Sequence, residues 1–243
     1  VSMGGLKKHD KKQKKDQNLV KIIRPFDGVA VIELNDAERA NAMDEDIAEE
    51  FANAVCLLEK EKDLRGVIVQ GNGNHFCTGI HPYSFVKEIQ KTTVLDAAAR
   101  IFRLYSSFTS ISRLSVPVLA VLHGKVVGGG FALSLNADWR VCTADSVFNY
   151  GNIPRGVCPG LHLSRNLSQI VGSATAMASY LEDSTFTAQQ MLEASIVQKI
   201  ATTNESAREL ALERMRKIVS CPPTGVKETM KTLRQNFYDE DLL

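Results

Sequence analysis

Apolar positions follow two periods along the chain, and each period predicts one kind of element. Short runs rich in β-branched residues predict buried strands over 29–34, 67–70, 116–122 and 140–142. Apolar residues spaced three or four apart predict an amphipathic helix over 44–60. Further helices are predicted over 81–91, 128–137, 163–171, 174–181, 188–195 and 205–220. Strands that alternate with helices are typical of an α/β fold.

The first 18 residues differ in composition from the rest. Six lysines crowd positions 7–15, and few apolar residues accompany them. Such a segment buries too little apolar surface to offset its ordering entropy, so residues 1–18 are predicted to be a disordered basic tail or linker. A docking tail for an acidic partner is the alternative. Residues 19–243 are predicted to form a single domain.

The overall composition is that of a soluble globular protein. Of 243 residues, 44% are hydrophobic and 23% charged, and the net charge of +1 predicts no nucleic-acid partner and no membrane surface. The best apolar run, 116–122, is too short to span a bilayer. Five widely spaced cysteines without a CxxC pair predict reduced thiols and a cytoplasmic location.

Two glycine-containing loops, 74–81 and 123–130, carry the candidate chemistry. Each follows a predicted strand and leads into a predicted helix. Glycine lets the backbone approach a ligand closely, and the first N–H groups of a helix have no intrahelical partner. Two such segments that face one point would bind a developing oxyanion. A tight packed turn is the alternative for GGG at 128–130, and no phosphate-loop pattern is present.

Several ordered motifs then resemble a known family. They are DAERANAM at 36–43, FCTGI at 76–80, the segment from LAVLHG through GGG to LNAD at 119–138, and the segment 187–197. Together they resemble the enoyl-CoA hydratase/isomerase (crotonase) family over about residues 20–225. The resemblance implies an α/β fold, a crotonase-type spiral of ββα units with a C-terminal helical region. It also implies a homotrimer.

The resemblance further implies how the loops act. The backbone N–H groups of Ile80 and Gly129 would hold the oxygen of an acyl thioester while an enolate develops. The substrate would be carried on coenzyme A or on the phosphopantetheine arm of an acyl carrier protein. No other cofactor and no metal site is predicted, because the five histidines are scattered along the chain.

Both glutamates of the family's hydratases are replaced here. The resemblance places Ala132 and Asn152 at these positions, and neither side chain transfers a proton. Water addition needs a general acid and a general base, so enoyl hydration is disfavoured. Decarboxylation generates the enolate by losing CO2 and needs no such base. The chain is therefore predicted to be a lyase that resembles the decarboxylases of polyketide β-branching cassettes, which act on a glutaconyl group.

Five further residues are candidates for carboxylate binding and protonation. Tyr83 and Lys87 have the i, i+4 spacing that places them on one helix face. His81 follows the first oxyanion donor, Asn152 offers an amide, and Arg155 offers planar donors for a carboxylate. A solvated surface or a helix cap is the alternative for each of these side chains. Tyr150 is predicted mainly to pack in the core.

Two other functions stay open. A dehydratase or hydratase with relocated acid–base groups would centre on His81. A catalytically silent module that only binds a thioester would show the same loss of both glutamates, because a fold alone does not imply activity.

Overall fold

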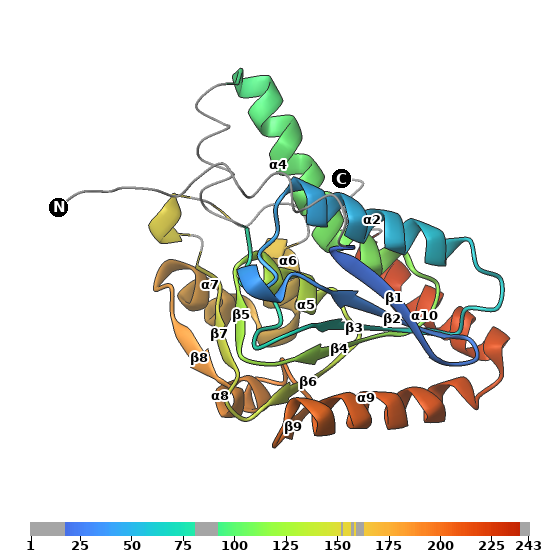
Figure 1. The fold of residues 1–243 in the computed structure, drawn as a ribbon. Helices are drawn as coiled ribbons and strands as arrows, with labels where there is room; N and C mark the ends of the chain where they lie inside the picture. Colours follow the sequence, from blue (N-terminus) through green and yellow to red (C-terminus); the bar gives the residue numbers. More distant parts are fainter. Residues whose placement is uncertain (1–17, 81–91, 152, 157, 159–162, 239–243) are drawn as a thin grey trace.

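The computed structural model describes residues 18–80, 92–151, 153–156, 158 and 163–238. Its main feature is a six-stranded sheet in the order β1-β2-β3-β4-β6-β9 (Figure 1). The strands are β1 (Val20–Phe26), β2 (Val29–Leu34), β3 (Gly66–Gly71), β4 (Val118–Leu122), β6 (Trp139–Thr143) and β9 (Lys199–Ala201). β1 and β2 are antiparallel, and every other neighbouring pair is parallel. The carboxyl ends of β3 and β4 therefore lie at the same end of the sheet.

Side-chain alternation along the strands builds a hydrophobic core on each face of this sheet. In β2, Ala30 and Ile32 join the larger core, whereas Val29 and Val31 join the smaller one. Helix α9 (Asn204–Val219) covers the smaller core and lies below the sheet in Figure 1. The larger core is covered by α2 (Glu45–Glu59), α4 (Val94–Thr109) and α5 (Gly129–Leu135).

A second, three-stranded sheet completes the repeated unit of the fold. It contains β5 (Lys125–Val127), β7 (Val147–Asn149) and β8 (Thr185–Thr187). In β4-β5-α5 and again in β6-β7-α6, the first strand joins the large sheet, the second joins the small one, and a helix follows. This is the ββα repeat that the sequence resemblance implies, so the predicted fold class is confirmed.

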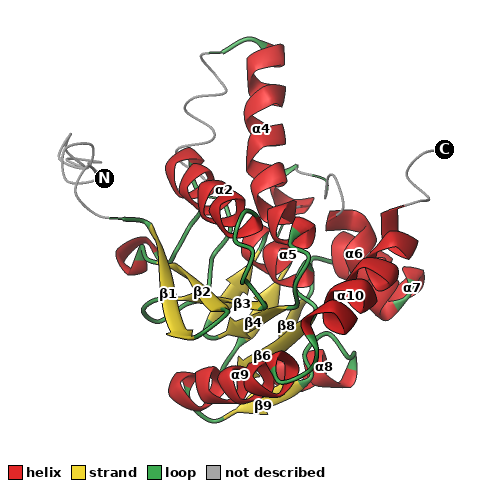
Figure 2. Cartoon of the chain, turned by 90° about the vertical axis from the view of Figure 1, so that its right-hand side faces the viewer, coloured by secondary structure: helices red, strands yellow, loops and turns green. Residues whose placement is uncertain are grey.

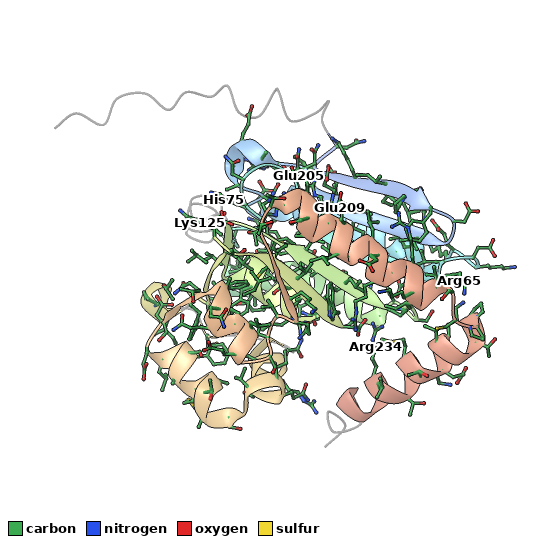
Figure 3. All side chains as sticks on the ribbon, turned by 90° about the horizontal axis from the view of Figure 1, so that it is seen from below. Arg65, His75, Lys125, Glu205, Glu209 and Arg234 are labelled. Carbon is green, nitrogen blue, oxygen red and sulfur yellow. The ribbon has the colours of Figure 1, made fainter. Side chains whose placement is uncertain are left out.

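Besides α9, four further helices of the described residues form the C-terminal region. They are α6 (Leu163–Val171), α7 (Ser173–Leu181), α8 (Ala188–Glu193) and α10 (Pro223–Tyr238). Arg234 fixes α10 to the body: it donates to the carbonyls of Ser112, Leu114 and Val116 and pairs with Asp138 at 2.8 Å. Figure 3 shows Arg234 between α10 and the sheet.

Most predicted elements are confirmed, with ends shifted by one or two residues. Several findings differ from the prediction, and strands β1, β7, β8 and β9 were not predicted. Residues 125–127 form strand β5 and not a loop, and helices α4 and α10 were not predicted. The first half of α4 projects from the body, with Leu95 and Phe102 largely exposed (Figure 2). The predicted helix over 81–91 and the basic tail, apart from Asn18, lie outside the described residues.

The described helices have at most 16 residues each. None of them combines the length and the hydropathy that crossing a membrane requires.

Candidate active site

The two loops that the sequence singles out run side by side in the structure. The first, residues 72–80, follows β3 and is here called the oxyanion loop. The second contains β5 and the glycine turn, residues 128–130. The Phe76 N–H donates to the His123 carbonyl at 2.9 Å, and the Val127 N–H donates to the Cys77 carbonyl at 3.0 Å. The oxyanion loop therefore lies along β5 and approaches the start of α5 with it.

Glycine is required where the two loops meet. Gly79 has φ of +81° and Gly128 has φ of +54°, a region that other residues rarely adopt. A β-carbon on Gly79 would lie 2.9 Å from the backbone nitrogen of Gly129. A β-carbon on Gly130 would lie 2.3 Å from the carbonyl oxygen of Cys77. Only a bare backbone at these positions lets the oxyanion loop pack against the first turn of α5.

The backbone N–H groups of Ile80 and Gly129 are available to an acceptor. Met43 and Ile80 form a parallel bridge in which the Met43 N–H donates to the Gly79 carbonyl at 2.7 Å. Because N–H groups alternate in direction along an extended segment, the Ile80 N–H faces away from Met43. Gly129 is the first residue of α5, and its N-cap, Gly128, has no side chain that could accept. Within the described residues, neither N–H donates a backbone hydrogen bond.

Asn41 holds the oxyanion loop from behind. Its side chain is fully buried, and its φ is +52°. The Nδ2 group donates to the carbonyls of Asn72, His75 and Phe76 at 2.9, 2.8 and 3.2 Å. The Oδ1 atom accepts the Asp36 N–H at 2.8 Å. One amide thus satisfies four backbone groups and fixes the oxyanion loop to the loop that precedes α2.

The loop that carries Asn41 is fixed by charged side chains. Arg39 pairs with Asp36 and, at 2.7 Å, with Asp44. Asp44 is also the N-cap of α2, where it accepts the Ile47 N–H at 3.2 Å. The position of Asn41 is therefore tied to the start of a well-packed helix.

The first turn of α5 is apolar. A β-carbon on Gly129 would lie 2.4 Å from Cζ of Phe108, a fully buried ring of α4 that forms the floor under this turn. Ala132, one turn of α5 further, is 1% exposed and presents only a methyl group. Asn136 donates to the Ala132 carbonyl at 2.9 Å and so engages the end of the helix. No side chain of α5 ionises, so this helix supplies neither an acid nor a base.

The structure brings together only part of the predicted site. Ile80 and Gly129 lie on the two loops that meet, and their role as oxyanion donors stays a prediction. His81, Tyr83, Lys87 and Asn152 lie outside the described residues. The backbone of Arg155 ends the short 3-10 helix η4 (Ile153–Arg155), and its side chain is outside the described part of the structure. The predicted roles of these five residues stay predictions.

Two features of the site were missed by the sequence analysis. Asn41 lies within a family-like motif, but no spacing rule reveals that its amide holds a loop about 30 residues away. The other feature is a cluster of phenols formed by Tyr105, Tyr150 and Tyr180 beside α5. The Tyr150 ring packs edge-on against Tyr180, with centroids 4.6 Å apart, and lies 5.8 Å from the Phe131 ring. Their separation along the chain hides this cluster from any local pattern.

Burial controls the ionisation of the groups near the loops. It raises the pKa of the Cys77 thiol to about 12, so this cysteine is no nucleophile at neutral pH. It raises the pKa of Tyr150 well above the ordinary value, with neighbouring Tyr180 adding to the shift. The pKa of Tyr180 is raised to about 12 for the same first reason. Within the described residues, no group of three or more His, Cys, Asp or Glu side chains could hold a metal ion.

Comparison with known proteins gives a consistent family assignment. The family model for enoyl-CoA hydratase/isomerase matches residues 25–242. A mitochondrial Delta(3,5)-Delta(2,4)-dienoyl-CoA isomerase from Mus musculus is 26% identical over 87% of this chain and 68% of its own length. Ethylmalonyl-CoA decarboxylase from the same species is 24% identical over 92% of this chain and 70% of its own length.

Solved structures agree on the fold. The crystal structure of a probable enoyl-CoA hydratase/isomerase from Mycobacterium abscessus superposes with a TM-score of 0.79 at 27% identity. The alignment covers 90% of this chain and 82% of the other.

Proposed function

The chain belongs to the enoyl-CoA hydratase/isomerase family, and from this premise we propose that it is a lyase that decarboxylates a carboxylated enoyl thioester. One observation carries the proposal. The N–H groups of Ile80 and Gly129 lie on two loops in backbone contact, while Ala132, which the sequence resemblance aligns with an acid–base glutamate of the family's hydratases, carries only a methyl group. On this alignment, the two backbone donors that would stabilise an enolate are present, and one of the two acid–base side chains that add water is absent.

The chemistry follows from what each reaction needs. Hydration requires a base that activates water and an acid that protonates carbon. Decarboxylation forms the enolate when the C–C bond to the carboxylate breaks, and its electron pair moves onto the thioester oxygen. Two backbone donors aimed at that oxygen lower the barrier directly, and loss of one such donor costs about 3–4 kcal/mol in known oxyanion holes. The site then needs only a proton donor.

The name of one relative supports this reaction. The mouse protein named ethylmalonyl-CoA decarboxylase aligns over 92% of this chain. Its name indicates that a protein of similar sequence catalyses decarboxylation. We extend the proposal to a glutaconyl-type acyl group in polyketide β-branching, carried on coenzyme A or on an acyl carrier protein, and to a homotrimeric assembly. His81, Tyr83, Lys87, Asn152 and Arg155 are the candidates for binding the substrate carboxylate.

Mass spectrometry of the acyl chain tests the proposed function. The protein is incubated with 3-methylglutaconyl and 3-hydroxy-3-methylglutaryl thioesters, each on coenzyme A and on an acyl carrier protein. We expect the glutaconyl substrate to lose the mass of CO2, and a crotonyl thioester, which has no carboxylate, to stay unchanged. Loss of water from the hydroxy substrate would instead identify a dehydratase. Binding of the thioesters with no turnover would identify a silent module.

A further inference from the structure

Tyr150 contacts the first turn of α5 twice. It follows β7, where the carbonyl of Asn149 accepts the Gly128 N–H at 2.9 Å, and its own carbonyl oxygen lies 3.5 Å from where a β-carbon on Gly128 would be. Its ring then packs against Phe131, the residue that precedes Ala132. Backbone and side chain thus both lie beside the glycine turn that carries one of the two oxyanion donors.

The hydroxyl of Tyr150 is buried without a hydrogen bond of acceptable geometry among the described residues. The residue is 2% exposed, and its hydroxyl oxygen is shielded from solvent. The neighbouring phenol of Tyr105 donates to the carbonyl of Cys158 at 3.4 Å, whereas Tyr180 meets Tyr150 edge-on, with its hydroxyl near the Tyr150 hydroxyl. A buried unpaired polar group destabilises a protein by about 1–3 kcal/mol. Such a group calls for an explanation, and a bound substrate that interacts with the hydroxyl is one.

We propose that the Tyr150 hydroxyl is the proton donor of the reaction, delivering its proton to the carbon of the enolate that CO2 leaves behind. This inference rests on the proposed function. The electron pair of the broken C–C bond, held in the enolate, forms the new C–H bond with the Tyr150 proton. The resulting phenolate regains a proton from water between turnovers.

The environment of Tyr150 suits this role. Burial and the nearby phenols raise its pKa, so the hydroxyl keeps its proton at neutral pH. A thioester enolate is a much stronger base at carbon than a phenolate, so the proton transfer remains downhill. The Cys77 thiol, a further proton-bearing group beside the loops, is buried and accepts the Gly79 N–H at 3.4 Å.

The variant Tyr150→Phe tests the inference, with Tyr180→Phe as the matched control. Both are assayed with the glutaconyl thioester in D2O, and the position of deuterium in the product is read by NMR. The dienolate accepts a deuteron at either of two carbons, so a positioned donor labels one carbon and bulk solvent labels both. We expect Y150F to lower kcat by about 100-fold with little change in KM. In this variant, deuterium should appear at both carbons of the dienolate. We expect Y180F to lower kcat by less than tenfold and to give a product with deuterium at a single carbon.

Thermal melting separates a catalytic role from a structural one. Because the Tyr150 hydroxyl makes no hydrogen bond of acceptable geometry among the described residues, removing it is expected to change the Tm of Y150F little. A clearly lower Tm or an unfolded variant would assign the residue a structural role and overturn the inference. Unchanged kcat and labelling in Y150F would also overturn it while leaving decarboxylation intact. If the wild-type protein releases no CO2, the proposed function fails and the inference fails with it.

Discussion

Replacing Asn41 should loosen the oxyanion loop and so lower both stability and activity. Asn41→Gly removes an amide that donates two protons to backbone carbonyls and accepts one N–H, while it tolerates the positive φ of 52°. At about 1 kcal/mol for each of three hydrogen bonds, the free energy of unfolding should fall by about 3 kcal/mol. For Asn41→Ala, the free energy of unfolding should fall by about 1 kcal/mol more, because alanine is strained in the left-handed region.

Urea unfolding and steady-state kinetics of these variants measure the two effects. A displacement of the loop by about 1 Å is enough to lower the rate about 100-fold, so both variants should lose kcat even at temperatures where they are fully folded. Asn53→Ala on the exposed face of α2 is the control and should change the free energy of unfolding by less than about 0.5 kcal/mol. Full stability and full activity in Asn41→Gly would refute the role assigned to this amide.

Three further predictions concern other parts of the chain. Gly130→Ala places a β-carbon against a backbone carbonyl of the oxyanion loop, so it should lower the free energy of unfolding by about 1–3 kcal/mol in urea titrations. The control Gly225→Ala adds a β-carbon in open space on α10 and should not lower this free energy. Burial lowers the pKa of His123, so the unfolded chain binds its proton more readily, and stability is lost as pH falls below about 6.5. His123→Gln should flatten that loss in urea titrations as pH falls below about 6.5, and an unchanged slope would contradict the assignment. Arg234→Ala removes the pairing with Asp138 and should speed hydrogen exchange in α10 while the sheet stays protected; uniform exchange changes would contradict this.

Periodicity was sufficient for the long, strongly patterned elements. Strand β2 is an apolar run that is buried along its whole length, and helix α2 buries residues spaced three or four apart, so their sequences predict them within one residue. Strand β5 has only three residues, and no period is visible over so short a length. Helix α4 lies half outside the body, so its first half does not bury a regular apolar face.

The candidate site likewise has one part that the sequence predicted and one part that it did not. Ile80 and Gly129 were identified because glycine-containing motifs recur in a fixed order in the family. The role of Asn41 depends on carbonyls of a loop that begins about 30 residues later, and that of Tyr150 on rings from α5 and α7. Such contacts exist only after the sheets have formed. Local sequence therefore suggested packing for Tyr150 and gave Asn41 no role.

The N–H groups of Ile80 and Gly129 are expected to share one oxygen of the substrate. A crystal structure of the protein with a ketone analogue of the thioester, in which a methylene group replaces the sulfur, tests this directly. We expect the carbonyl oxygen to lie about 2.7–3.1 Å from both backbone nitrogens, with the acyl chain running along the first turn of α5. A carbonyl oxygen bound elsewhere, or one that contacts neither nitrogen, would show that these two N–H groups do not form an oxyanion hole.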